Sequence, residues 1–339
     1  MIRSLVRRTL TNLWMARLFT PRSAARVALY ALRRLILRQR IPGTGIVALT
    51  FDCQCRCACC SSDLFRKGYE GKPGMPLDEL LAVVERIADA GSPRIHFSGG
   101  ESLLNRHLTA AVSAASRRGL LCFVETNGLA MTEDRLRALK DAGVACVNVS
   151  LDSADPAVHD ALRGVPGCHA KAVAALRLCA EHGVACMVST YATHGNIRDG
   201  GLAAVVALAR ELRCTGVRVL AAQPSGAWIK RPDVILDEED ITRVEAMLPL
   251  TFPVLNRTAL IECPLKTGYK IYVLPDGSLA PCEHLPFVWS DSKGMDWQQL
   301  RDRTDSCSMF DKPYRCMPRD PEFRRDYLDP LADDSTIDL

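Results

Sequence analysis

Residues 46–60 read IVALTFDCQCRCACC, an apolar run that passes directly into five cysteines within eight positions. The run at 46–51 is long enough for a buried β-strand, so the cysteines lie in the loop that follows it. Cys53, Cys57 and Cys60 give the spacing CxxxCxxC. Three thiolates on one loop can bind three irons of a [4Fe-4S] cluster and leave the fourth iron open to an outside ligand. Zinc held by clustered thiolates is the alternative.

Five more short apolar or β-branched runs follow this loop, and segments with helical spacing, such as 77–90, separate them. The runs lie at 94–98, 121–125, 145–151, 184–190 and 216–221. Several helical segments close on a glycine suited to a left-handed C-terminal cap, namely Gly91, Gly119, Gly143 and Gly183. Alternating strands and helices predict a parallel sheet, and six units are too few for a closed eightfold barrel. We therefore expect an α/β fold with a partial (β/α)6 barrel.

The regions on either side of this pattern are expected to be separate. The chain has 339 residues, of which 48% are hydrophobic and 24% charged, which excludes a disordered or low-complexity protein. We predict arginine-rich helices at 1–45, the barrel at 46–230 and a small C-terminal region at 231–339. Thr20 and Pro21 are typical of a helix start. In the last region, Asp276-Gly277 indicates a hairpin over 270–281.

A second motif, FSGGES at 97–102, stands at the end of the second predicted strand. Adjacent glycines allow a backbone edge to approach a ligand closely, and Glu101 adds a carboxylate that can accept from an amine. Together with CxxxCxxC at the preceding strand end, this motif makes residues 46 to about 222 resemble the radical S-adenosylmethionine (SAM) superfamily. The resemblance implies a partial (β/α)6 barrel.

The resemblance also implies the cofactor contacts. Cys53, Cys57 and Cys60 would ligate a [4Fe-4S] cluster whose open iron binds SAM. The remaining contacts would come from the strand ends: Gly99, Gly100 and Glu101 to the methionyl amine, Thr126 and Asn127 after the third strand, Ser150 and Asp152 to ribose hydroxyls, and Arg163 to the methionyl carboxylate. Helix capping and a solvated arginine are the alternatives for the last three. Cys59 occupies the position of a family aromatic residue near the adenine, which leaves that contact open, and Cys55 is expected to be a spectator.

Four cysteines near the C-terminus form a second group. Cys263 and Cys282, with Gly277 between them, resemble the opening of SPASM and Twitch extensions, in which a hairpin brings two cysteines to an auxiliary cluster. Only Cys307 and Cys316 follow, which favours the shorter, Twitch-like form with one auxiliary [4Fe-4S] cluster. Zinc at these residues and a merely structural cysteine pair are the alternatives. Either Glu283 or His284 could replace Cys307.

The resemblance implies an enzyme that reductively cleaves SAM to a 5′-deoxyadenosyl radical, with an electron donor such as flavodoxin or ferredoxin. We expect a small-molecule substrate, such as a nucleoside, sugar or lipid. A peptide-modifying enzyme is the first alternative, although the chain lacks room for a winged-helix module that grips a leader peptide. A non-catalytic iron-sulfur or zinc protein is the second.

Charge and cysteine usage bear on the partners and the compartment. The net charge of +4 is too small to predict nucleic-acid binding, but residues 1–51 hold ten arginines and no acid, so the rest carries −6. No uncharged apolar run approaches the roughly 18 residues that span a bilayer. Fifteen cysteines without a secretory signal indicate a cytoplasmic protein. Contact of residues 1–40 with an anionic membrane is one hypothesis; packing against the barrel and a transit peptide are the others.

Overall fold

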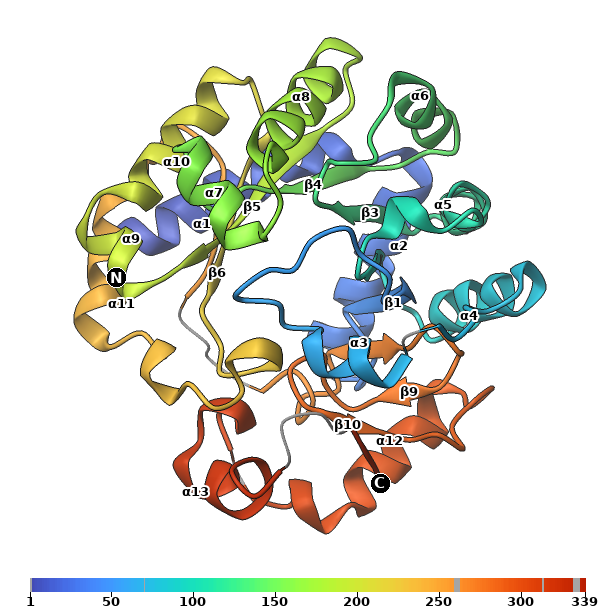
Figure 1. Ribbon diagram of the computed structural model, residues 1–339. Coiled ribbons are helices and arrows are strands. Elements are labelled where there is room, and N and C mark those ends of the chain that lie inside the picture. The colour runs from blue at the N-terminus through green and yellow to red at the C-terminus, as the bar shows by residue number, and fades with distance from the viewer. Residues whose placement is uncertain (1, 70, 259–262, 313, 332–335) are drawn as a thin grey trace.

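The computed structural model describes residues 2–69, 71–258, 263–312, 314–331 and 336–339. Its centre is an open, curved parallel sheet with helices around the outside (Figure 1). The six predicted runs are strands: β1 Thr44–Thr50, β2 Arg94–Gly99, β3 Leu121–Thr126, β4 Cys146–Ser150, β5 Cys186–Ala192 and β6 Gly216–Ala221. The α/β class and the partial barrel are thus confirmed.

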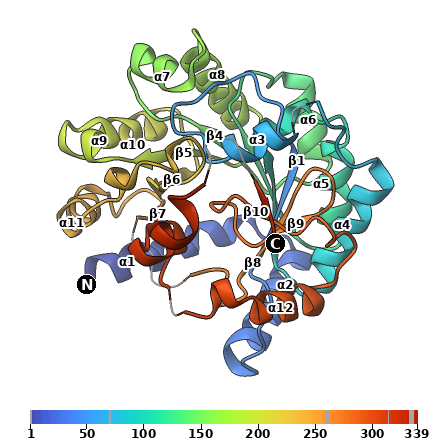
Figure 2. The ribbon, with the colours of Figure 1, turned by 60° about the horizontal axis from the view of Figure 1, so that its bottom comes forward.

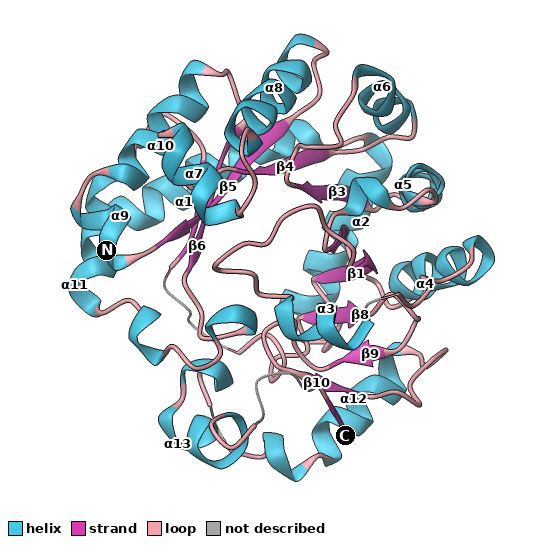
Figure 3. Ribbon diagram, in the orientation of Figure 1, coloured by secondary structure: helices cyan, strands magenta, loops and turns pink. Residues whose placement is uncertain are grey.

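Crossover helices follow the strands, as Figure 3 shows by colour. They are α3 Asp63–Tyr69, α4 Leu77–Asp89, α5 Leu108–Arg117, α6 Glu133–Asp141, α7 Pro156–Arg163, α8 Cys168–Glu181, α9 His194–Arg198 and α10 Gly201–Glu211. Helix α4 illustrates why they form: Leu80, Val83, Val84 and Ile87 recur at helical spacing and are all buried. Gly91, at the end of this helix, has φ +88°, the left-handed conformation expected of it.

The sheet continues beyond the six predicted strands at both edges. Strand β7 (Val254–Arg257) pairs with β6 in parallel, and β8 (Lys270–Val273) pairs with β1 in parallel. The short β9 (Leu279–Ala280) runs antiparallel to β8 and completes the predicted hairpin at Gly277. The order is β7-β6-β5-β4-β3-β2-β1-β8-β9. Residues from the C-terminal region therefore form both edges of the barrel sheet.

Helix α11 (Glu238–Met247) packs beside α9 in the second half of the barrel. The remaining C-terminal elements are β10 Phe287–Val288, α12 Trp297–Ser306, α13 Pro321–Phe323 and β11 Ile337–Asp338. Trp289 and Phe323 belong to the same apolar core as Val47 and Phe97 of β1 and β2. The C-terminal region and the barrel consequently share one core.

Two N-terminal helices cover the amino ends of the strands. Helix α1 (Ile2–Met15) crosses near β7, and α2 (Pro21–Ala31) continues into a π-helical turn, η2 (Leu32–Ile36). Thr20 and Ser23 form a reciprocal capping box at the start of α2, as the sequence indicated. Figure 2 shows both helices on the side of the barrel opposite the loop that follows β1. No helix in the described ranges is long and apolar enough to cross a membrane.

Candidate active site

The cysteine loop leaves β1 at Thr50 and crosses the carboxyl ends of the strands (Figure 1). The glycine motif fixes its start, because Gly100 N–H donates to the Thr50 carbonyl at 2.7 Å and Glu101 N–H to the Asp52 carbonyl at 2.9 Å. A Cβ atom on Gly99, whose φ is +127°, would lie 2.1 Å from the Thr50 oxygen, and one on Gly100 would lie 2.4 Å from the Asp52 oxygen. The two adjacent glycines therefore allow the end of β2 to approach the backbone at the start of the cysteine loop closely.

The end of the cysteine loop is held by two other segments that sequence reasoning missed. The C-terminal turn of α7 accepts a hydrogen bond from the cysteine loop, because Ala58 N–H donates to the Leu162 carbonyl at 3.0 Å. The 3-10 helix η4 (Gly226–Trp228) lies against the last cysteine, where Ala227 N–H donates to the Cys60 carbonyl at 2.9 Å. A Cβ on Gly226 would lie 2.1 Å from that carbonyl oxygen, so this glycine was the available signal.

The three predicted ligands, Cys53, Cys57 and Cys60, are partly buried thiols on this loop. Asn127 Nδ2 donates to Cys53 Sγ at 3.7 Å, and Arg163 Nη1 donates to Cys57 Sγ at 3.7 Å. Donors aimed at sulfur favour the thiolate form that metal binding requires. The chain thus offers three thiols on one rigid loop, two of them with N–H donors, and this donor set fits an iron-sulfur cluster.

Cys55 lies closer to these ligands than its expected spectator role suggested. Its side chain is 2% exposed, its backbone N–H donates to Cys53 Sγ at 3.4 Å, and its thiol lies beside the sulfurs of Cys168, Cys53 and Cys57. Cys55, aided by Arg163 and opposed by burial, lowers the pKa of Cys57 to about 6. Cys55 is therefore placed to influence the sulfurs of the predicted ligands from the buried side of the loop.

Glu101 is 1% exposed, and its carboxylate accepts hydrogen bonds from groups of the protein. It accepts from Thr126 Oγ1 at 2.7 Å, from Asn127 N–H at 2.7 Å and from Leu103 N–H at 3.0 Å. These bonds hold the end of β3 beside the cysteine loop, and burial raises the pKa of Glu101. The predicted contact of Glu101 with a methionyl amine remains a prediction.

Asp152 and Arg163 form an ion pair above the end of β4, with Oδ2 and Nη2 2.6 Å apart. The other carboxylate oxygen of Asp152 accepts from Tyr191 N–H at 3.3 Å. Ser150, the last residue of β4, is partly buried. The structure thus gathers these predicted residues at the mouth, although Arg163 already pairs with Asp152 and reaches Cys57.

An aromatic pair lies beside Cys59, where the resemblance left the adenine contact open. Tyr191 of β5 and Trp228 of η4 meet edge to face with their ring centroids 6.1 Å apart. Burial raises the pKa of Tyr191, and the nearby Cys59 acts in the same direction. Sequence reasoning missed both rings, since only the folded chain brings Trp228 next to the strand.

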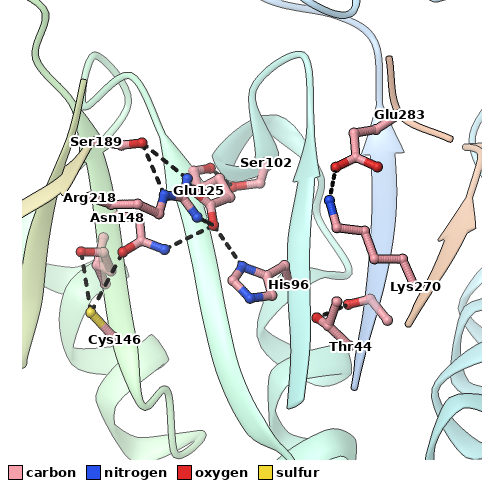
Figure 4. A network of polar contacts seen from close by, with 12 residues as sticks. Thr44, His96, Ser102, Glu125, Cys146, Asn148, Ser189, Arg218, Lys270 and Glu283 are labelled. Atoms are coloured by element: carbon pink, nitrogen blue, oxygen red, sulfur yellow. Dashed lines mark hydrogen bonds and ion pairs between the residues drawn. The ribbon is translucent and has the colours of Figure 1, made fainter. Parts of the chain in front are cut away.

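A polar network lies inside the barrel below the mouth (Figure 4). Glu125 of β3 is its centre: Arg218 Nη1 donates to Oε1 at 2.9 Å, Asn148 Nδ2 at 2.8 Å, and His96 Nδ1 lies 2.8 Å from the same oxygen. Burial alone would raise the pKa of Glu125, but Arg218 and His96 lower it to about 2. Arg218 also reaches Ser189 of β5, so the network links five strands. In the sequence, only the occurrence of polar residues within otherwise apolar strands could have indicated this network.

The C-terminal cysteines lie near the end of β6. Cys263 is 7% exposed and lies near both Cys282 and Cys316, whose pKa values are raised mainly by burial and less by this neighbour. Burial, with a smaller effect of Cys263, raises the pKa of Cys316 to about 12. Cys316 Sγ lies 3.9 Å from Gln223 Oε1, which follows β6. Cys307 lies at the C-terminal cap of α12 and packs against the same apolar core as Cys263 and Cys282.

The two residues named as substitutes for Cys307 lie next to Cys282. Glu283 pairs with Lys270 of β8, and His284 Nδ1 lies 3.4 Å from Ser225 Oγ. Burial opposes ionisation of Glu283, but Lys270 and His284 lower its pKa to about 2. Glu283 is therefore occupied by its ion pair with Lys270, whereas His284 lies beside Ser225 in the segment after β6.

In the described part of the chain, ligand atoms of three metal-binding side chains come within 4.8 Å of one another at His194, Asp237 and Asp240. Arg198 donates to the Asp240 carboxylate there at 3.3 Å, so this group is an ion-pair contact between α9 and α11. Neither cysteine group meets the same 4.8 Å distance among the described residues.

The partial parallel barrel, with a cysteine loop over the carboxyl ends of its strands, is the architecture that the resemblance to radical SAM proteins implied. Comparison with known proteins points to the same superfamily. The radical SAM superfamily model matches residues 47–207. This part of the chain is therefore similar to the radical SAM superfamily.

Two curated relatives and two solved structures illustrate the similarity. AdoMet-dependent heme synthase of Nitratidesulfovibrio vulgaris is 28% identical over 151 residues, covering 44% of this chain and 41% of the relative. PqqA peptide cyclase of Gluconobacter oxydans is 30% identical over 201 residues, covering 59% and 54%. The chain thus spans about half the length of these curated relatives.

Among solved structures, Streptococcus suis SuiB bound to its precursor peptide SuiA superposes with a TM-score of 0.59 at 15% identity, covering 75% of this chain and 63% of SuiB. The structure of anSMEcpe with bound AdoMet gives a TM-score of 0.59 at 14% identity, covering 82% and 91%. At such low identity these superpositions bear on the fold alone.

Proposed function

We propose that this protein is a radical SAM enzyme that modifies a peptide substrate. The observation that carries the proposal is the cysteine loop: three thiols at CxxxCxxC spacing, fixed by backbone hydrogen bonds over the mouth of a radical SAM barrel. When bound, the cluster and SAM would supply a 5′-deoxyadenosyl radical that takes a hydrogen atom from the substrate.

The chain's own residues would hold and shield these groups. Cys53, Cys57 and Cys60 would ligate the cluster, and the N–H donors of Asn127 and Arg163 would stabilise two of the sulfurs. Other mouth residues proposed to contact SAM are Cys59, Gly99, Gly100, Thr126, Ser150 and Asp152. Glu101 would act indirectly, by fixing the loop after β3.

The choice of a peptide replaces our expectation of a small molecule. Similarity to the heme synthases extends over 151 and 158 residues, about the length of the barrel match. Similarity to the peptide cyclases is longer, at 201 residues for the G. oxydans protein and 242 for that of Rhodopseudomonas palustris, or 70% of this chain. The peptide cyclases are therefore similar to more of the chain than the barrel, which supports the peptide alternative.

We also propose that Cys263, Cys282 and Cys316 hold an auxiliary cluster in a Twitch-like C-terminal region. Their mutual electrostatic interactions and burial support this grouping. The fourth ligand would be Cys307 after movement of the α12 end, or His284. An electron donor such as flavodoxin or ferredoxin would supply the cluster at the cysteine loop.

SAM cleavage tests the catalytic part of the proposal. The anaerobically reconstituted protein is incubated with dithionite and SAM, and 5′-deoxyadenosine is measured by chromatography. The wild type and Cys214→Ala, a buried cysteine in the second half of the barrel, should form it. Cys57→Ala should not. A wild-type protein that binds iron but yields no 5′-deoxyadenosine would point to the non-catalytic alternative.

Substrate choice needs a separate experiment. Synthetic peptides corresponding to short reading frames beside the gene are added to the same reaction and examined by mass spectrometry. A change in peptide mass that depends on SAM and Cys57 would support a peptide substrate. Mass changes confined to small molecules of a cell extract would refute it while leaving the radical chemistry intact.

A further inference from the structure

The N-terminal helices turn their apolar side chains toward solvent. Of the thirteen large hydrophobic residues exposed in the described structure, ten lie between residues 5 and 37. The six most exposed are Leu5 at 65%, Leu13 at 63%, Leu29 at 53%, Leu35 at 72%, Ile36 at 70% and Leu37 at 56%. So many exposed large apolar side chains in one short segment are unusual for helices that serve only to pack against their own protein.

Arginines, in contrast, face the barrel. Arg7 is 2% exposed and pairs with Glu245 of α11. Arg26 donates to the Ser92 carbonyl at 2.6 Å and to the Arg118 carbonyl at 3.2 Å, both at the amino-end face of the barrel. The inner side of these helices thus packs through arginines together with a few apolar side chains, such as Met15, Leu18 and Val27. The exposed leucines and Ile36 on the outer side are left open to solvent within the described chain.

The charge of this region selects the kind of partner. Residues 1–51 contain ten arginines and no acid. Arg17, Arg22 and Arg38 are exposed on the same helices and their connection, beside the apolar side chains. A second copy of this chain would bring like charges together, whereas an anionic lipid surface offers both opposite charge and an apolar interior.

We propose that the outer face of α1, α2 and η2, here called the N-terminal face, docks the protein peripherally on an anionic membrane. The leucines would enter the boundary between headgroups and acyl chains while the exposed arginines pair with lipid phosphates. Because these helices cover the amino ends of the strands, the mouth with its cysteine loop points away from the bilayer (Figure 2). Substrate would thus reach the mouth from the aqueous side.

Vesicle binding tests this proposal on the full chain. Vesicles of phosphatidylcholine with phosphatidylglycerol are compared with phosphatidylcholine alone, at low and high salt, by co-sedimentation. The wild type should pellet with anionic vesicles at low salt. Leu35→Ser/Ile36→Ser should lower the affinity for these vesicles at least about tenfold, because each leucine-sized side chain contributes substantially to partitioning into the bilayer. Leu77→Ser/Val158→Ser changes two exposed residues elsewhere and should bind like the wild type.

Charge is separated from apolar contact by Arg17→Gln/Arg22→Gln/Arg38→Gln, which should lose binding to anionic vesicles. Thermal melts confirm that each variant is folded. Equal failure of wild type and variants to pellet would overturn the proposal. So would a wild-type dimer, seen by light scattering, that Leu35→Ser/Ile36→Ser dissociates without any lipid binding. SAM cleavage without vesicles is a separate readout, so this proposal can fail while the proposed function stands.

Discussion

Hydrogen bonds to the cysteine sulfurs are the residue-scale feature with the most direct chemical consequence. Each donor stabilises negative charge on sulfur, which is larger in the reduced cluster than in the oxidised one. Asn127 donates to Cys53 and Arg163 donates to Cys57, and the buried Cys55 thiol lies beside the sulfurs of both predicted ligands. Loss of one such donor should therefore lower the reduction potential of a bound cluster without removing a ligand.

Cys55→Ala tests this expectation. The variant should keep the iron content of the wild type, and its cluster should have a potential lower by on the order of tens of millivolts, as for one weak hydrogen bond. Cys55→Ser restores a donor and should return most of the shift, while Cys57→Ala should lose the cluster. Potentiometric titration followed by electron paramagnetic resonance measures the shift. Loss of iron in Cys55→Ala equal to that in Cys57→Ala would make Cys55 a ligand.

Local sequence predicted which residues gather at the mouth better than it predicted what they contact. Strand ends placed Glu101, Thr126 and Asp152 at one edge because parallel strands share their direction. The partners of Glu101 come from β3, and Arg163 is held by Asp152, so neither contact could be read from spacing. Such side-chain pairings depend on the relative heights of neighbouring strands, which the sequence does not specify.

At the scale of elements, the cysteine loop depends on backbone contacts with its neighbours. Gly226 has φ +55°, and a Cβ there would lie 2.1 Å from the Cys60 carbonyl oxygen. Gly200 has φ +84°, but nothing lies within 4 Å of its Cβ position. These two glycines share a left-handed conformation that would strain any other residue, and they differ in their surroundings.

Gly226→Ala should therefore displace the end of the loop and reduce cluster incorporation, whereas Gly200→Ala should cost only about 1 kcal/mol of stability from backbone strain. Iron content after anaerobic reconstitution and urea unfolding measure the two effects. Similar iron content in both variants would show that the contact between η4 and Cys60 is dispensable for cluster binding.

The network around Glu125 links β2 to β6 across the inside of the barrel. Glu125→Gln leaves Arg218 partly buried without its carboxylate and should lower the free energy of unfolding by about 3 kcal/mol. Glu125→Gln/Arg218→Gln removes both charges and should recover part of this loss. Urea unfolding at pH 7 compares them. Equal stability of Glu125→Gln and wild type would mean that the ion pair does not stabilise the sheet.

The same network should produce acid sensitivity. Burial would raise the pKa of Glu125, but Arg218 and His96 overcome this effect and lower it to about 2, below the usual 4.5 of a glutamate. A lowered carboxylate pKa contributes stability above pH 4.5 that is lost as the pH falls toward 2. Unfolding of wild type should accordingly become easier across this range, and more steeply than for Glu125→Gln/Arg218→Gln.

Alternating apolar runs and helical spacing were enough to predict all six barrel strands, because each buried strand carries its own signal. Strand β7 escaped prediction, because its four-residue segment pairs only with β6, about 35 residues earlier in the chain. The hairpin at Gly277 was found from its turn, but nothing local indicated that its first strand would extend the barrel at β1. Pairing between strands distant in sequence was therefore the part of the sheet that the sequence did not predict.

On the scale of the whole molecule, the barrel and the C-terminal region cannot be treated as independent units. Strand β8 pairs with β1, which leads into the cysteine loop, and Trp289 shares a core with Val47. Cys316 approaches Gln223 at the end of β6. The C-terminal cysteines therefore lie on elements that also support the barrel mouth, and an auxiliary cluster there would be integral to the fold.

Iron counting tests that arrangement. Two [4Fe-4S] clusters predict about eight irons and eight sulfides per chain after reconstitution. The variant with Cys53, Cys57 and Cys60 all changed to alanine should retain about half, because the C-terminal thiols lie on other elements. Cys282→Ala/Cys316→Ala should retain the other half if the barrel remains folded, which circular dichroism checks. About four irons with one bound zinc in the wild type would exclude a C-terminal cluster, and no iron in the triple variant would show that C-terminal assembly requires the first cluster.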